Sequence, residues 1–146
     1  MPNFTPFLRD EEVAAIGCGL MTRTLPKAEW THAAHFAAAL WLLACRPEIN
    51  VQEAMPGMIR AYNQATGTAN TDTSGYHETI TMASLRAARA FLAEHASLRL
   101  HAVCNELMGS PLGKSDWLLA YWSRECLFSV EARRAWVEPD LQPLPW

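Results

Sequence analysis

The segment Glu29-Trp30-Thr31-His32-Ala33-Ala34-His35 opens the most apolar stretch of the chain, which continues to Cys45. Apolar side chains and two histidines recur there at helical spacing, in two adjoining rows. A helix that is apolar on two adjoining faces usually lies at the centre of a bundle. We therefore predict a central helix that begins near Lys27 and ends before Pro47. One row holds Trp30, Ala34, Ala37, Ala38 and Trp41, and the other holds His32, His35, Ala39 and Leu42.

A second polar-to-apolar transition occurs in Asn70-Thr71-Asp72-Thr73-Ser74-Gly75-Tyr76-His77-Glu78-Thr79-Ile80-Thr81. Its Gly, Thr, Asn, Asp and Ser residues are typical of turns and helix caps. With Gly75 as the N-cap, Glu78 falls at the third helical position, where a capping box has its acidic residue. We predict a helix from Ser74 or Gly75. Its buried face begins with His77 and continues with Thr81, Leu85, Ala88, Phe91, Leu92 and His95.

Helical spacing and helix-stop residues predict one helix before the central one and several after it. The predicted ranges are about 10–23, 51–66 and 98–108, a segment capped by Ser115, and 130–136. Pro56 removes a backbone hydrogen bond within 51–66, so we expect a kink or a late start there. No stretch alternates as a strand would. The sequence predicts one all-α domain over residues 1–146, a bundle of four main helices with additional short C-terminal helices.

Composition limits the classes of function. Of the 146 residues, half are apolar and 18% are charged, which is typical of a compact globular protein. The net charge of −3 favours no nucleic-acid partner. The apolar run 33–45 is shorter than the ~20 residues of a membrane span, and no basic segment followed by an apolar run opens the chain, so we expect no secretory signal. Four cysteines without a C-x-x-C motif are typical of thiols in a reducing compartment, so we expect a cytoplasmic protein.

Three histidines are the strongest candidates for a functional site. Residues three apart on a helix differ by roughly 60° in direction, so His32 and His35 can converge on one ion. His77, on a neighbouring helix, would supply a third imidazole. Three neutral ligands leave one position open for water or substrate. We predict a divalent transition metal (zinc, iron, nickel or manganese) in a metal-dependent enzyme of hydrolytic or lyase type.

Residues near these histidines complete the predicted site. Glu78 is the candidate catalytic base, and Trp30, Tyr76, Glu29 and Asp72 are the candidates for binding substrate. An aromatic ring such as Trp30 can form the wall of a pocket. The spacing Glu29-x-x-His32 also occurs in di-iron carboxylate proteins, but those need two such motifs and this chain has one.

The alternative is a non-catalytic helical module that binds a small-molecule ligand or an interaction partner. Each histidine is then hydrogen-bonded within the fold, by a threonine hydroxyl or a backbone carbonyl, and Asp72 and Glu78 cap a helix. The late tryptophans and the proline-rich tail also permit a homodimer contact. These tryptophans are Trp117, Trp122, Trp136 and Trp146.

Two segments resemble a bacterial family of helical proteins to which we can assign no activity. They are L-P-x-x-E-W-T-H-x-A-H over Leu25–His35 and N-T-D-T-x-G-Y-H-E-T-I-T over Asn70–Thr81. This resemblance covers the front two-thirds of the chain and implies that the two segments belong together. In its fold the chain also resembles the DinB-like bundles, in which three histidines from two helices hold a metal. Here the histidine pair lies on the earlier helix at a spacing of three, whereas the DinB pattern has the reverse order and a spacing of four.

Overall fold

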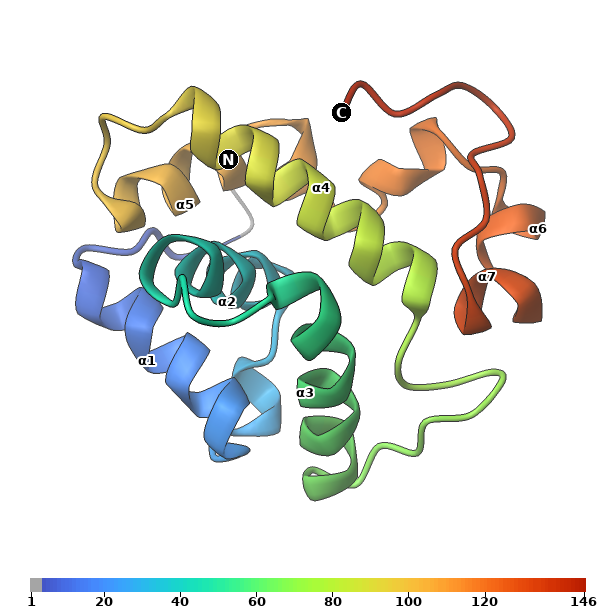
Figure 1. The fold of residues 1–146 in the computed structure, drawn as a ribbon, viewed down its shortest axis with the longest axis horizontal. Coiled ribbons are helices and arrows are strands. Elements are labelled where there is room, and N and C mark those ends of the chain that lie inside the picture. Colours follow the sequence, from blue (N-terminus) through green and yellow to red (C-terminus); the bar gives the residue numbers. More distant parts are fainter. Residues whose placement is uncertain (1–3) are drawn as a thin grey trace.

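Figure 1 shows a protein built from helices, in a computed structural model that describes residues 4–146. The predicted all-α fold is confirmed, because the described residues contain no strand. The four longest helices are α1 to α4. In chain order the elements are α1 (Asp10–Thr22), the 3-10 turn η1 (Lys27–Glu29), α2 (His32–Cys45), α3 (Val51–Ala65), α4 (Glu78–Glu94), α5 (Leu100–Gly109), the 3-10 turns η2 (Pro111–Gly113) and η3 (Trp117–Ala120), α6 (Arg124–Leu127) and α7 (Val130–Arg134).

Helix α2 lies at the centre of the core and packs against α1, α4 and α5. Nine of its fourteen residues are buried, and five of these are alanines, which let neighbouring helices approach closely. On the α1 side, Gly17 leaves room for the Trp41 ring: a Cβ at this glycine would lie 2.1 Å from a ring carbon. Burial on most of its circumference explains why the sequence of this helix shows two apolar rows instead of one.

The start of α2 differs from the prediction by five residues. Residues 27–29 form η1, and Trp30 (φ −83°, ψ 68°) and Thr31 (φ −91°, ψ 175°) leave helical geometry. The Thr31 hydroxyl accepts a hydrogen bond from Ala34 N at 3.2 Å and so acts as an N-cap. The apolar row that includes Trp30 therefore crosses a helix boundary. His32 is the first helical residue.

The predicted start of α4 at Ser74 or Gly75 is wrong. Gly75 has φ +77°, and a Cβ there would lie 2.5 Å from the Ala69 carbonyl oxygen, so this glycine belongs to a tight turn. The N-cap is His77, whose Nδ1 accepts a hydrogen bond from Ile80 N at 3.1 Å. Glu78 is the first helical residue, and the predicted capping box does not form.

Two further expectations concern helix boundaries. Helix α3 starts at Val51, as predicted, with Asn50 as its N-cap, so of the kink or late start expected from Pro56 the late start does not occur. The proline lies inside the helix. Ser115 was expected to cap a helical segment, but the residue before η3 is Asp116, which makes no side-chain cap bond.

The chain after η3 folds back on the start of α4 (Figure 1). The Trp122 side chain is fully buried, and its Nε1 donates to the Val137 carbonyl at 3.1 Å. The Thr79 hydroxyl donates to Ala135 O at 3.0 Å and accepts from Val137 N at 3.2 Å. The first turn of α4 therefore anchors the segment that contains α6 and α7.

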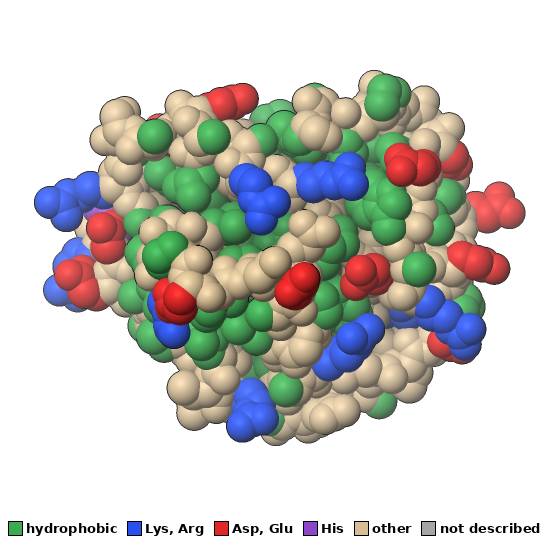
Figure 2. All heavy atoms as spheres, in the orientation of Figure 1, with side chains coloured by type: hydrophobic (Ala, Val, Ile, Leu, Met, Phe, Trp, Pro, Cys, Tyr) green, Lys and Arg blue, Asp and Glu red, His purple; other side chains and the backbone are tan. Residues whose placement is uncertain are grey.

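The surface in Figure 2 intersperses cationic and anionic side chains between apolar ones, with no large region of one sign on this face. None of the helices in the described part of the chain is both long enough and apolar enough to cross a bilayer. All four cysteines, Cys18, Cys45, Cys104 and Cys126, are free. Burial raises the pKa of the Cys104 thiol to about 12.

Candidate functional site

A hydrogen bond of the His32 ring joins η2 to the start of α2. Its Nε2 lies 2.8 Å from the carbonyl oxygen of Leu112 in η2. A carbonyl oxygen can only accept, so we assign the proton to Nε2 and the lone pair to Nδ1. The half-buried ring also meets Phe36 edge-on, with 5.3 Å between centroids. Nδ1 has no hydrogen-bond partner among residues 4–146 and is the acceptor this ring can offer to a ligand.

The His35 ring contacts the two residues that precede α2. Its Nδ1 donates to the Thr31 carbonyl at 2.7 Å, and the ring packs on Trp30 with 3.8 Å between centroids. Trp30 in turn meets Tyr62 of α3 at 5.2 Å. The residue is exposed at the surface, while the protein atoms packed around its imidazole, which include the Trp30 ring, lower its pKa to about 4. The neutral ring is therefore the stable form in the folded protein.

The His77 ring uses both of its nitrogens inside the fold. Nε2 donates to the Leu127 carbonyl of α6 at 2.7 Å, while Nδ1 caps α4 by accepting from Ile80 N. The residue is 7% exposed, and burial lowers the pKa of its imidazole. A metal ligand needs a free lone pair, and His77 has none left to offer.

The three histidines therefore hold three different parts of the chain. His32 binds η2, His35 binds the turn before α2, and His77 binds α6. Within residues 4–146 no group of three or more His, Cys, Asp or Glu side chains is arranged to hold a metal ion. The residues do not fit a three-histidine metal centre. Metal binding stays a prediction from the sequence that this arrangement does not support.

The predicted catalytic base, Glu78, is engaged with an aromatic residue. The Tyr76 hydroxyl donates to its carboxylate at 2.6 Å, and the Arg60 guanidinium lies over the Tyr76 ring, 4.4 Å from the centroid. Burial raises the pKa of Tyr76, and the neighbouring carboxylate raises it further. Glu78 also borders a small hollow of about 160 Å³ with Arg86, on the side of α4 that faces Trp136.

Asp72, a predicted substrate-binding residue, belongs to an exposed ion pair. Its carboxylate accepts from Arg134 Nε at 2.8 Å and Nη2 at 2.6 Å, which lowers its pKa. Next to it, Arg133 Nη1 donates to the Gly75 carbonyl at 3.0 Å and to Tyr76 O at 3.3 Å. The 70–81 segment therefore docks α7 as well as α6.

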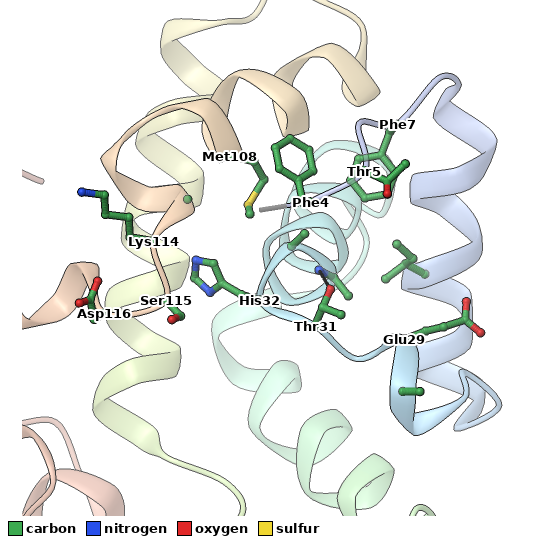
Figure 3. Close-up of a pocket in the computed structure, with 15 residues that line it drawn as sticks. Phe4, Thr5, Phe7, Glu29, Thr31, His32, Met108, Lys114, Ser115 and Asp116 are labelled. Carbon is green, nitrogen blue, oxygen red and sulfur yellow. Dashed lines mark hydrogen bonds between the residues drawn. The ribbon is translucent and has the colours of Figure 1, made fainter. Parts of the chain in front are cut away.

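A hollow with a volume of about 990 Å³ opens at the start of α2 (Figure 3). We call it the His32 hollow. Figure 3 shows the His32 ring turned towards the segment of Lys114 and Ser115, with Glu29 at the opposite end. Phe7 is held there because its backbone N and O pair with the Asn105 side chain, both at 2.9 Å. The lining residues are Phe4, Thr5, Phe7, Ile16, Ala28, Glu29, Thr31, His32, Ala33, Ala34, Met108, Gly113, Lys114, Ser115 and Asp116.

Two of the predicted site residues, Glu29 and His32, line this hollow. The others, Trp30, His35, Asp72, Tyr76, His77 and Glu78, do not line it. Sequence reasoning missed its apolar walls, because Phe4, Phe7 and Met108 are distant in sequence and carry no motif. The glycines and the proline of segment 109–113 predict a break in the helix. This break was the one local feature that indicated a turn of the chain near Ser115.

Fold and site define the protein as an all-α protein with a mixed polar and apolar hollow at the amino end of its central helix. No family model, curated protein or solved structure matches the chain.

The lowered pKa values predict how stability depends on pH. His35 and His77 bind protons less readily in the folded than in the unfolded chain, whose histidines titrate near 6.5. Their contribution to the free energy of unfolding is complete above pH 6.5 and is lost as pH falls through their lowered pKa values, which for His35 is about 4. We expect the melting temperature to fall over this range, and His35→Gln to flatten the fall.

A chelator distinguishes the effect of histidine protonation on the melting temperature from the effect of a bound metal. Protons also displace a metal from histidine, so the pH trend alone does not distinguish the two. Without a metal centre, EDTA leaves the melting temperature at pH 7.5 unchanged after dialysis against zinc, iron, nickel or manganese. A melting temperature that drops by several degrees with EDTA at pH 7.5 would restore the three-histidine metal hypothesis.

Proposed function

We propose that this chain is a small-ligand-binding protein and that its ligand occupies the His32 hollow. The observation that carries the proposal is the His32 ring itself. One of its nitrogens is fixed by the Leu112 carbonyl, and the other is an acceptor that no residue among 4–146 engages, on a residue that lines the hollow. The volume of about 990 Å³ lies at the upper end of the ~300–1,000 Å³ of ligand sites.

The lining indicates the chemistry of the ligand. Phe4, Phe7, Ile16 and Met108 provide apolar walls, which favour an apolar body. The acceptor Nδ1 of His32 favours a hydrogen-bond donor on that body, because a carbonyl or ether oxygen facing it would leave both acceptors unpaired. The best match is a small apolar molecule that carries a hydroxyl or amino group.

A metal-dependent enzyme is the weaker candidate. Its third ligand would be His77, whose two nitrogens are engaged by Leu127 and Ile80. Its base would be Glu78, which lies against Tyr76 and outside the His32 hollow. The ligand-binding proposal needs no rearrangement of these bonds.

Two matched probes test the proposal, benzyl alcohol and benzyl methyl ether. They share the apolar ring, but only the alcohol can donate a hydrogen bond. One hydrogen bond contributes about 0.5–1.5 kcal/mol, so we expect the alcohol to bind roughly two- to tenfold more tightly in a calorimetric or NMR titration. Equal affinities, or no binding of either probe, would contradict the proposal.

The variant His32→Gln isolates the acceptor. The Nε2 of glutamine can still donate to the Leu112 carbonyl, but no acceptor is bonded to Cγ in place of Nδ1, because the glutamine Oε1 lies one bond farther out. We expect this variant to keep its melting temperature within a few degrees and to lose the preference for the alcohol. His95→Gln, which alters a ring bonded to the Phe91 carbonyl away from the hollow, is the control and should keep the preference.

A further inference from the structure

A second hollow, of about 450 Å³, lies on the other side of η2 and has an aromatic lining. We call it the aromatic hollow. Its walls come from segments far apart in sequence: Phe91 of α4, Trp117 of η3, Tyr121, and Trp146 at the end of the described chain. Apart from these rings, its lining is Glu94, Ser110, Pro111, Leu112, Lys114, Asp116 and Ala120.

Three of the rings that line the hollow pack against one another. The centroids of Trp117 and Tyr121 are 6.1 Å apart, those of Trp117 and Trp146 are 5.9 Å apart, and those of Tyr121 and Trp146 are 6.3 Å apart. The planes of these pairs meet at 73°, 72° and 52°, so no two rings are stacked. At these distances and angles the rings contact one another edge to face, and Trp117 is only 7% exposed, so the ring surface open to the hollow comes mainly from the half-buried Tyr121 and the exposed Trp146.

The rim of the aromatic hollow carries more negative than positive charge. Glu94 and Asp116 contribute two carboxylates, and Lys114 contributes one ammonium group. All three side chains belong to exposed residues, so none is neutralised by burial against a partner within the hollow. A positively charged guest gains attraction both from the ring faces and from this rim.

We infer that the aromatic hollow binds a small organic cation with a quaternary ammonium head, such as a trimethylammonium group. Such a head is bulky and weakly hydrated, and it donates no hydrogen bonds, which suits a wall of rings with few polar atoms. The inference is independent of the His32 hollow, because the two sites share only residues of the η2–η3 connection, Lys114 and Asp116, and the turn of η2 lies between them.

The test compares choline with 3,3-dimethylbutan-1-ol, in which a neutral tert-butyl group replaces the trimethylammonium head. The two probes have nearly the same shape and the same hydroxyl, so the difference in affinity reports the charge. From the strength of cation–π contacts we expect choline to bind about tenfold more tightly in an NMR titration of the full chain. The indole signals of Trp117 and Trp146 should shift with choline.

Trp146 is the wall residue to vary, because it is 36% exposed and its replacement leaves the core in place. We expect Trp146→Ala to weaken choline binding about fivefold and Trp146→Phe, which keeps a ring face, to retain most of it. Glu94→Gln should weaken binding about twofold. Phe128→Ala removes another exposed ring outside the hollow, so this control should bind choline as the wild type does.

Equal affinity for choline and the neutral alcohol would show an apolar site without charge selection and would overturn the inference. Failure of choline to bind would overturn it as well. Binding that is lost in His32→Gln but kept in Trp146→Ala would place the cation in the His32 hollow and would equally contradict the aromatic site.

Discussion

Replacing His77 with alanine is expected to lower the free energy of unfolding by about 3 kcal/mol. The variant loses the cap of α4, worth ~1 kcal/mol, and leaves the Leu127 carbonyl without its donor, which costs roughly 1–3 kcal/mol more. Because Leu127 belongs to α6, the loss should be concentrated in the chain after η3. Chemical denaturation gives the total, and amide hydrogen exchange should show faster exchange at 123–137 than in α1 and α2.

His77→Asn separates the two effects. The asparagine oxygen can take the place of Nδ1 and cap α4, but the shorter side chain does not reach the Leu127 carbonyl. We expect its destabilisation to be smaller than that of His77→Ala by about 1 kcal/mol. If both variants are as stable as the wild type, His77 does not join α4 to α6 as described.

Gly113→Ala is expected to destabilise the protein by about 3 kcal/mol, through a clash that no side-chain movement can relieve. A Cβ at Gly113 would lie 1.9 Å from the Met108 carbonyl oxygen and 2.7 Å from the Met108 carbonyl carbon. Both are backbone atoms, so the backbone itself would have to move. The shift falls on η2, which carries the Leu112 carbonyl bonded by His32. Benzyl alcohol should therefore bind this variant more weakly than the wild type.

Gly109→Ala is the matched control, four residues away at the end of α5. A Cβ there meets nothing within 4 Å, and its φ is not in the left-handed region. Such a substitution is neutral or stabilises by about 0.4–1 kcal/mol. Thermal melts of the two variants side by side give the comparison. Equal melting temperatures for Gly113→Ala and Gly109→Ala would show that η2 does not pack against Met108 as closely as described.

The fold class and the central helix could be predicted because they depend on apolar spacing. The two rows of α2 reflect real burial on several sides, and the 51–65 helix follows directly from its pattern. The first residues of the helices could not be predicted equally well, because the position of an N-cap depends on the path by which the preceding chain reaches the helix. At α4 a left-handed Gly75 ends a turn, and an imidazole takes the capping position that serine, threonine or asparagine usually holds.

The histidines were correctly singled out as unusual, yet their roles lay beyond the sequence. The partners of His32 and His77 are the carbonyls of Leu112 and Leu127, which are 80 and 50 residues away. A backbone carbonyl leaves no trace in the residue type that carries it, so a histidine bonded to one looks in sequence like a metal ligand. Of the two functions predicted from the sequence, only the non-catalytic binding module included histidines that are hydrogen-bonded to backbone carbonyls.

The most direct measurement is a long-range proton–nitrogen NMR spectrum of the histidine side chains at pH 7.5, recorded with and without benzyl alcohol. We expect the proton of His32 on Nε2 and a lone pair on Nδ1, and benzyl alcohol should shift that Nδ1 signal. The nitrogens of His77 should stay in place, because both are engaged within the fold. A proton on Nδ1 of His32, or a ligand-induced shift at His77 but none at His32, would contradict the proposed binding site.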